Sequence, residues 1–460
     1  MSDPSRKRII FVTGFLVLSR LEKALSYPLQ PKPSSWTRTR CKLLTSRLPK
    51  SRSKESSFLF RAHEKLSSGE ERSKEKIQFE TYSSILDIDA KDWTSCMTDD
   101  ETASPFTEYT WLQSLEESKC ACEETGWIPQ HVAIKIDERV CGFVPIYVKT
   151  NSMGEFIFDS GWAEAASANG IDYYPKVLVG IPFTPVTGQR ILLHPRVKTS
   201  KSKVARLRKL VSIYLKEVAS KNMFSSVHIN FLTEDEATDI TWKLDEEDSR
   251  ATSDGTVGKD FSSIIDQLEH IDTESYLRRT SLQYHWTNVN SRNGGMPYKS
   301  FEEYLSCFRS KRRIAIRRER KRVQVEEDIR IDAVVGRDIL KYDGLVEQMY
   351  QIYLSTVNKM FWGRQYLSLE FFRLLASSDF IDNLCFMCAR RNSTGETLKA
   401  TDVFAGTFNI VKNGVFYGRY WGCLEEVKNL HFETCYWAAI EYCIRNGLKR
   451  MEPGAGGGGK

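Results

Sequence analysis

The chain has 460 residues, 41% of them hydrophobic, and a formal net charge of +6, which together predict two or three globular domains. The charge is uneven: residues 1–54 hold thirteen Lys/Arg against two acids, a net +11, so the remaining residues carry −5. A mildly acidic body argues against a general nucleic-acid binder.

The basic N-terminal segment is expected to lie outside the fold, as far as residue 76. Its apolar run Ile9–Leu18 is half a membrane span, and Arg6–Arg8 before it would suit a signal peptide. Residues 31–54 continue basic, Ser-rich and free of acids, which is typical of an organelle transit peptide. We expect a plastid location, with a mitochondrion second and secretion third, and no membrane span.

Eleven scattered cysteines, an odd number, do not resemble a disulfide framework. Cys385 and Cys388 have no second pair at zinc spacing, and Cys120 and Cys122 also stand alone. The sequence therefore predicts buried thiols in a reducing compartment. We expect no metal site and no bound cofactor.

The folded body is predicted to begin at residue 77 with a first half of mixed helices and strands. Pro105 opens a helix, and a later helix is expected from Arg206 to Lys221. Its first apolar segment is 79–86, and the predicted strands are 131–136, 140–150, 155–159 and 226–232.

Residues 160–188 are rich in aromatic and turn-forming residues. Pro182 and Pro185 hold Phe183-Thr184 in a stiff extended loop, with hydroxyls at Thr184 and Thr187. Such a loop suits either a rigid groove wall or a packed interdomain connection.

Residues 244–260 are acidic and without periodicity, and are expected to be a disordered insertion, within a linker at 236–272. A second half follows from 273, with helices at 301–325, 339–357 and 367–377 and a strand at 384–391. The first of these helices is strongly basic, which favours a solvated, salt-bridged face over a phosphate-binding one.

The clearest unit lies near the C-terminal end. Asn413-Gly414 between two apolar runs predicts a tight hairpin of strands 402–412 and 415–423, followed by a helix with Asn429 as N-cap and a short strand at 448–452. Counting back across the turn pairs Tyr417 with Ile410 and Arg419 with Phe408. An arginine in this apolar setting needs a partner, either a carboxylate such as Glu425 or Glu433, or an anion or carbonyl in a cleft.

The halves share an order of elements and a glycine, in Val140-Cys-Gly-Phe-Val and Phe404-Ala-Gly-Thr-Phe, which indicates a duplicated α+β module. Several motifs, from about residue 106 to 460, resemble the FemAB-like, or peptidoglycan biosynthesis/recognition, family of predicted N-acyltransferases. They are Gly154–Glu164, Tyr173–Lys176, Pro182–Gly188, Ser310–Arg313, Ile316–Arg320, Tyr417–Cys423 and Leu430–Glu433.

The resemblance implies an α+β fold of two tandem GNAT-like domains, 77–235 and 273–460, each a twisted mixed sheet flanked by helices. It further implies transfer of an acyl or aminoacyl group from acyl-CoA or aminoacyl-tRNA to an amine of a small molecule or peptide. The chain stops where the family continues into further strands, so the C-terminus is expected to be truncated.

Such a transfer needs a base for the amine and stabilisation of the carbonyl oxyanion, but no protein nucleophile. We expect a cleft between the domains, walled by 159–188 and 417–433. The candidate bases are Glu155, Asp159, His431 and Glu433. The candidate substrate-binding residues are Trp162, Tyr174, Lys176, Thr184, Thr187, Tyr417, Arg419 and Trp421.

A non-catalytic GNAT-fold module is the alternative. It would recognise a glycan, a peptide or RNA through the same groove. A tRNA-dependent transferase would combine both properties, and the sequence leaves the oligomeric state open.

Overall fold

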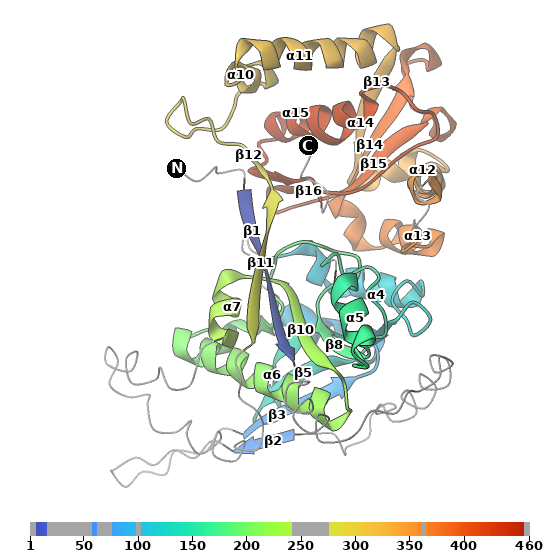
Figure 1. Cartoon of the computed structure of the whole chain (residues 1–460). Helices are drawn as coiled ribbons and strands as arrows, with labels where there is room; N and C mark the ends of the chain where they lie inside the picture. The colour runs from blue at the N-terminus through green and yellow to red at the C-terminus, as the bar shows by residue number, and fades with distance from the viewer. Residues whose placement is uncertain are drawn as a thin grey trace.

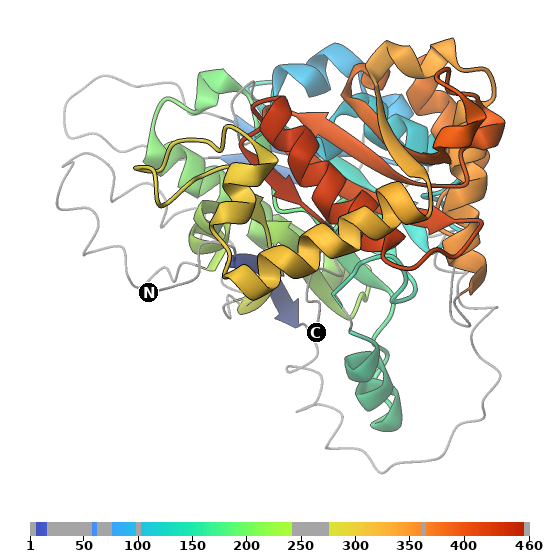
Figure 2. The same ribbon diagram turned by 90° about the horizontal axis from the view of Figure 1, so that it is seen from above.

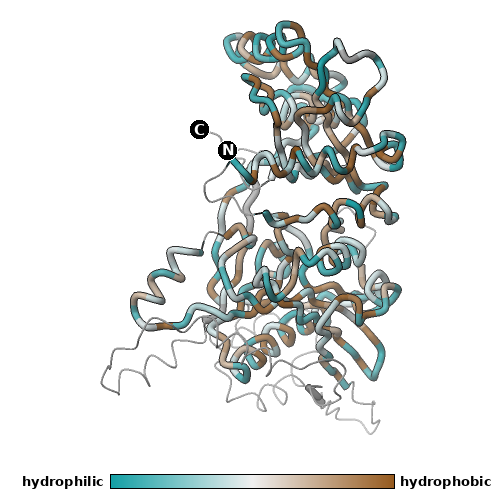
Figure 3. Tube along the Cα trace, turned by 90° about the vertical axis from the view of Figure 1, so that its right-hand side faces the viewer, coloured by the Kyte–Doolittle hydropathy of each residue, from teal (hydrophilic) through white to brown (hydrophobic). Residues whose placement is uncertain are grey.

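The computed structural model describes residues 6–15, 58–61, 76–97, 103–157, 159–241, 276–359 and 365–454. They form two modules that lie one above the other, each with hydrophobic stretches through its interior (Figure 1, Figure 3). Both modules combine helices with sheets that contain antiparallel and parallel strand pairs. The predicted α+β class with mixed sheets is therefore confirmed. No helix in these ranges is long and apolar enough to cross a membrane.

The first module contains two sheets, ordered β2-β3-β5-β6-β9 and β11-β1-β10-β8-β7-β4. Its strands are β1 (Arg6–Phe15), β2 (Phe58–Arg61), β3 (Lys76–Tyr82), β4 (Trp127–Pro129), β5 (His131–Ile136), β6 (Arg139–Val144), β7 (Ile146–Lys149), β8 (Lys176–Val179), β9 (Leu192–Leu193), β10 (Ser226–Leu232) and β11 (Leu277–Tyr284). Its helices are α3 (Ala90–Ser95), α4 (Tyr109–Glu117), α5 (Ser160–Ala168), α6 (Lys201–Lys221) and α7 (Glu234–Thr241). Only Pro145 separates β6 from β7, so one stretch of chain enters both sheets.

Strand β1 corrects the expectation that the N-terminal segment lies outside the fold. It pairs antiparallel with β10 on one side and β11 on the other. The side chains of Ile10, Phe11 and Val12 are buried. An apolar run too short to span a membrane is thus long enough for a central strand.

The second module has one sheet, ordered β12-β17-β16-β15-β14-β13. Its strands are β12 (Trp286–Thr287), β13 (Ile329–Val335), β14 (Leu384–Arg391), β15 (Ala405–Lys412), β16 (Val415–Cys423) and β17 (Arg450–Glu452). Its helices are α10 (Phe301–Ser306), α11 (Ser310–Lys321), α12 (Leu345–Lys359), α13 (Leu369–Ser377), α14 (Leu430–Phe432) and α15 (Ala438–Arg445). Two π-helical turns, Arg322–Glu326 and Glu433–Trp437, extend α11 and join α14 to α15.

The boundary between the modules differs from the predicted one. Strand β11, expected in the second domain, pairs with β1 in the first module, and the chain enters the second sheet only at β12. The predicted insertion at 244–260 lies outside the described residues.

The predicted hairpin is confirmed, with Asn413 and Gly414 both at positive φ (52° and 76°). Tyr417 lies opposite Ile410 as expected, but a β-bulge follows, and Phe408 pairs with Tyr420 instead of Arg419. The predicted pairing of Arg419 is therefore wrong, because Arg419 is the extra residue of the bulge.

The glycine shared by the two halves has the same packing role in both. A Cβ at Gly142 would lie 2.6 Å from the carbonyl oxygen of Leu192, and one at Gly406 would lie 2.5 Å from that of Met387. In each module, strand packing at this point excludes any side chain.

The modules share one hydrophobic cluster. Trp111 of α4 meets Phe371 of α13 edge to face, with ring centroids 5.2 Å apart, and Phe106 meets Tyr417 at 5.3 Å. Where Phe183 and Arg419 meet, the modules are in direct contact. The expected cleft between 159–188 and 417–433 is closed at this point.

Candidate functional site

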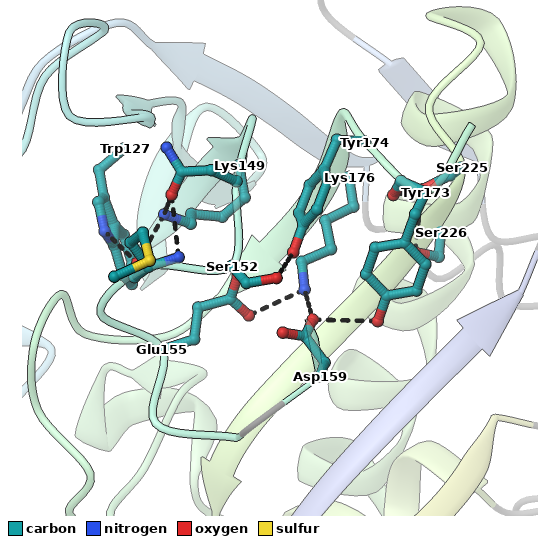
Figure 4. Close-up of polar contacts among 12 residues, drawn as sticks. Trp127, Lys149, Ser152, Glu155, Asp159, Tyr173, Tyr174, Lys176, Ser225 and Ser226 are labelled. Atoms are coloured by element: carbon teal, nitrogen blue, oxygen red, sulfur yellow. Dashed lines mark hydrogen bonds and ion pairs between the residues drawn. The ribbon is translucent and has the colours of Figure 1, made fainter. Parts of the chain in front are cut away.

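The site is built on the polar face of the first module's β11-β1-β10-β8 sheet. Val177 and Val227 point to the core beneath α6. Because side chains alternate along a strand, Lys176 of β8 and His228 and Asn230 of β10 point the other way. The segment between β7 and α5 covers this second face (Figure 4).

That segment carries Glu155 and Asp159 and is not the strand predicted at 155–159. Gly154 and Phe156 have positive φ (78° and 57°), so the chain turns sharply on either side of Glu155. Asp159 directly precedes helix α5. This irregular path directs both carboxylates towards Lys176.

Lys176, Glu155 and Asp159 form a buried ionic triad. The Lys176 Nζ lies 2.9 Å from Glu155 Oε2 and 2.5 Å from Asp159 Oδ2, and no member is more than 3% exposed (Figure 4). Tyr173 donates its hydroxyl to Asp159 at 3.0 Å, and the Tyr174 hydroxyl bonds Ser152. Three of the predicted site residues (Glu155, Asp159, Lys176) therefore lie in direct contact, with Tyr174 beside them.

The triad carries more negative than positive charge when both carboxylates are ionised. Burial raises the pKa of Glu155, although the Lys176 ammonium opposes this shift. Burial and the charges of Lys176 and Arg279 hold the pKa of His228 well below its ordinary value, so His228 supplies no positive charge near neutral pH. Burial also lowers the pKa of Lys149 to about 7; its Nζ lies 4.0 Å from the Trp127 ring centroid.

Several polar atoms here have no hydrogen-bond partner among the described residues. They include Asp159 Oδ1, Glu155 Oε1 and both amide atoms of Asn230, which is 3% exposed. Leaving a buried polar group unpaired costs about 1–3 kcal/mol. The free atoms suit a ligand that donates hydrogen bonds to the carboxylates.

A cavity of about 220 Å³ lies beside the segment that carries Glu155 and Asp159. Phe156 and Ile157, the residues after Glu155, line it, and so do Phe11 and Phe231. Gln283 closes the end towards the second module by donating to the carbonyls of Pro185 (3.4 Å) and Gly454 (3.1 Å).

Arg279 gives this cavity a cationic group. It lines the wall, and its guanidinium carbon lies 5.4 Å from the ring centroid of Trp162. Trp162, a predicted binding residue, is half exposed on α5. The cavity thus combines an aromatic lining with a cation on one wall and the acidic triad nearby.

Glu155, Asp159 and His228 offer ligand atoms within 4.8 Å of one another, a spacing that a metal ion can use. The Lys176 ammonium, however, bonds both carboxylates, and a divalent cation would have to displace it against like-charge repulsion. The cluster is better described as an acidic site partly neutralised by a lysine.

Of the predicted residues near the second module, three have structural partners. The Thr184 hydroxyl donates to the carbonyl of Pro182, and the buried Tyr417 ring packs on Phe106. Arg419 donates to the carbonyl of Phe183, and its guanidinium carbon lies 5.2 Å from the Phe106 ring centroid. Its partner is thus a carbonyl of the chain itself, and not Glu425 or Glu433. Thr187 is half-buried, and its hydroxyl has no partner among the described residues.

His431, Glu433 and Trp421 belong to a separate region around α14. Glu433 is buried, and Arg320 and Gln324 bind its carboxylate at 3.1 and 2.8 Å. His431 is exposed and contacts the Trp421 ring, with centroids 5.4 Å apart. Asn429 occupies the predicted N-cap position, but it has φ 70° and its side chain makes no capping bond. The predicted bases therefore divide between two places, and only the pair in the first module lies on a segment that lines the cavity.

Sequence reasoning missed Lys149, His228, Asn230 and Arg279. Lys149, His228 and Asn230 stand in runs predicted as ordinary strands. The alternation of His228 and Asn230 with valine and isoleucine in Val227-His-Ile-Asn230 is the available signal for a polar inner face. Arg279 falls in the range predicted for the second domain, and nothing in its local sequence connects it with Trp162.

Comparison with known proteins identifies one family. The chain matches the FemAB-like family, described as peptidoglycan biosynthesis/recognition, over residues 84–253 and 258–460. No curated protein sequence matches it.

Three solved structures show limited similarity. FemX has 11% identity and a TM-score of 0.37, covering 82% of this chain and 88% of its own. A conserved protein of unknown function from Bacteroides thetaiotaomicron has 11% identity and a TM-score of 0.35, covering 81% and 88%. A tandem GNAT protein from the clavulanic acid biosynthesis pathway has 10% identity and a TM-score of 0.34, covering 82% and 89%.

Proposed function

Because this chain belongs to the FemAB-like peptidoglycan biosynthesis/recognition family, we propose that it transfers an acyl or aminoacyl group to a primary amine. The observation that carries this proposal is the buried triad with its unpaired oxygens, on the segment whose Phe156 and Ile157 line the cavity. Two carboxylates share the Lys176 ammonium. Lys149 also acts on Glu155, but with a pKa of about 7 it neutralises the pair only in part near neutral pH, so a further cation is favourable there. The ammonium form of an amine acceptor meets that need.

The free acceptor atoms favour the same ligand. An ammonium has three N–H donors and no acceptor. Asp159 Oδ1 and the side-chain oxygen of Asn230 are buried acceptors without a partner among the described residues. An amine bound there would satisfy atoms that are costly to leave unpaired.

Glu155 is our candidate base for activating the amine. Burial raises the pKa of Glu155 from its ordinary value of 4.5 towards neutral pH, and a base is most effective when its pKa lies near the working pH. The carboxylate accepts one proton from the ammonium, and the amine nitrogen then attacks the donor carbonyl carbon. A C–N bond forms, the C–S or C–O bond to the donor breaks, and the leaving thiol or hydroxyl regains a proton.

The carbonyl oxygen becomes negative during this attack and needs a hydrogen-bond donor. The bulge in β16 displaces the backbone of Arg419 from the regular ladder, beside the Phe183 loop. A backbone N–H placed in this way is our candidate donor, and each such donor contributes about 2.7–4 kcal/mol. Positioning of the two reactants supplies much of the remaining acceleration.

The donor is proposed to be an acyl-CoA or an aminoacyl-tRNA, which a thermal-shift titration of the purified full chain distinguishes. A donor at one hundred times its Kd stabilises the folded protein by about 2.7 kcal/mol. In a module of this size that is a rise in Tm of roughly 5–11 °C. A rise with CoA thioesters alone identifies the first donor class, and a rise with tRNA alone the second.

Silence from both donors in a cooperatively melting protein would contradict the transferase proposal. The non-catalytic binding module would then be the better account. It predicts a rise in Tm with a glycan or an amine-bearing peptide and no formation of product.

A further inference from the structure

Helix α11 has an outward stripe that the proposed chemistry does not use. The stripe consists of Lys311, Ile314, Arg318, Lys321 and Val325, separated by three or four residues, so they share one side of the helix. Val325 lies in the π-helical turn that extends α11. The helix forms an outer edge of the second module and is uncovered when the molecule is seen from above (Figure 2).

The stripe is opposite the face that α11 buries. Ile316 and Val323 are fully buried and form the core side of this segment. Ile314 and Val325, in contrast, are 61% and 65% exposed. Two large aliphatic side chains therefore face outward between cations.

The basic residues of α11 divide in the same way. On its flanks, Arg317 pairs with Glu302, Arg312 lies 3.8 Å from Glu319, and Arg320 binds Glu433 and Glu441. The three cations of the stripe form no salt bridge with any residue in the described ranges. A solvated helix explains the paired flanks, but it gives no reason for unpaired cations aligned with exposed aliphatic residues.

We propose that the α11 stripe docks the protein onto a membrane surface that carries anionic lipid headgroups. The three cations complement the headgroup charge. Ile314 and Val325 enter the boundary between headgroups and acyl chains, where their burial is favourable. Nucleic acid would use the cations alone, so the aliphatic residues favour the membrane. The stripe extends about 21 Å along the helix, from the rise of 1.5 Å per residue over 14 residues.

Vesicle flotation of the purified full chain tests this proposal. We expect binding to vesicles of 70% phosphatidylcholine and 30% phosphatidylglycerol and little binding to pure phosphatidylcholine. Binding should weaken at high salt because exposed charges are screened. Each basic residue removed should reduce the partition constant roughly fivefold, so Lys311→Gln/Arg318→Gln/Lys321→Gln should reduce it about a hundredfold.

Two further variants separate charge from hydrophobicity. Ile314→Ser/Val325→Ser should reduce binding several-fold without changing the net charge, an effect that a purely electrostatic contact would not show. Lys91→Gln/Lys119→Gln/Lys201→Gln removes the same charge from exposed positions of the first module and should leave binding unchanged. Every side chain replaced in these variants is exposed, so the melting temperatures should stay as in the wild type.

Equal binding of the α11 charge variant and its control would overturn the proposal, and so would equal binding to both vesicle types. If the wild type fails to bind vesicles but binds a single-stranded RNA in an α11-dependent manner, the stripe serves a nucleic acid and the membrane proposal is wrong.

Discussion

Replacing Lys176 with methionine tests whether the triad is a buried ion pair. The side chains of Lys176, Glu155 and Asp159 are at most 1% exposed, and one ammonium serves both carboxylates at 2.9 and 2.5 Å. Removing one partner of a buried pair costs about 3–5 kcal/mol, because the remaining charges lose their compensation. For a module of 150–250 residues this corresponds to a fall in Tm of roughly 6–20 °C.

The loss should depend on pH in a definite direction. Without the ammonium, the pKa of Glu155 rises further above its ordinary 4.5 in the folded state. A carboxyl whose pKa is raised in the folded state contributes stability that is fully present below its unfolded pKa. This contribution is lost as the pH rises through the folded pKa. Lys176→Met should therefore recover part of its stability between pH 7 and pH 5, and adding Glu155→Gln should recover part of it at pH 7.

Lys341→Met is the matched control, assayed by urea unfolding and thermal melting beside Lys176→Met. Lys341 lies 2.7 Å from Asp338, but both side chains are more than 60% exposed. Exposed pairs contribute little, so the control should melt like the wild type. If Lys176→Met also melts like the wild type at both pH values, the triad is not buried as described.

Three further predictions concern other parts of the first and second modules. Because the folded pKa of Lys149 is lowered to about 7, the wild type should gain stability as pH rises from 7 towards 10.5, by at most about 1.4 kcal/mol per pH unit. Lys149→Met should lack this gain when the urea midpoints are compared across the same pH range. If both proteins gain stability equally with pH, the pKa of Lys149 is not lowered. Val12→Asp should greatly destabilise the protein in thermal melts, because it buries a charge in strand β1, whereas Val289→Asp at a half-exposed position should not; equal melts would show that β1 is not in the sheet. Gly406→Ala should cost about 1–3 kcal/mol by overpacking against the Met387 carbonyl, and Gly161→Ala, which has open space, should be tolerated; a tolerated Gly406→Ala would contradict the close strand approach.

The hairpin and the buried helices could be predicted because their signals are local. Asn413-Gly414 has few alternatives to a tight turn, and periodicity identified α6 and α13. The bulge at Arg419 has no signal in the local alternation of β16, and Arg419 contacts Phe183 in the other module. A long-range contact of this kind leaves no trace in the local pattern.

The candidate site was predictable in its residues but not in its geometry. The motif around Glu155 and Asp159 and the motif ending in Lys176 were both identified, yet nothing in the sequence showed that one ammonium joins them. Glu433 is predicted for the same site but binds Arg320 in the second module. These two residues are 113 positions apart in the sequence, so no local pattern shows that they pair.

The N-terminal segment shows where composition misleads. Its basic, Ser-rich character favours a transit peptide, whereas residues 6–15 form the strand between β10 and β11. Plastid location stays a prediction. Cleavage beyond residue 15 would remove β1. The N-terminus of the mature protein, determined by mass spectrometry, therefore shows whether the segment is removed as a transit peptide or kept as a strand of the sheet.

The most direct test of the central claim is a transfer assay that compares the wild type with Asp159→Asn. Purified full-length protein is incubated with acyl-CoAs or aminoacyl-tRNA and a peptide that carries a free primary amine, and the amide product is measured by mass spectrometry. The proposal predicts product with the wild type and roughly hundredfold slower formation with Asp159→Asn, because the amine loses a group that positions it, in a protein that still melts cooperatively. Product formed at equal rates by both proteins would show that the triad does not bind the amine, and no product from any donor would contradict the transferase assignment itself.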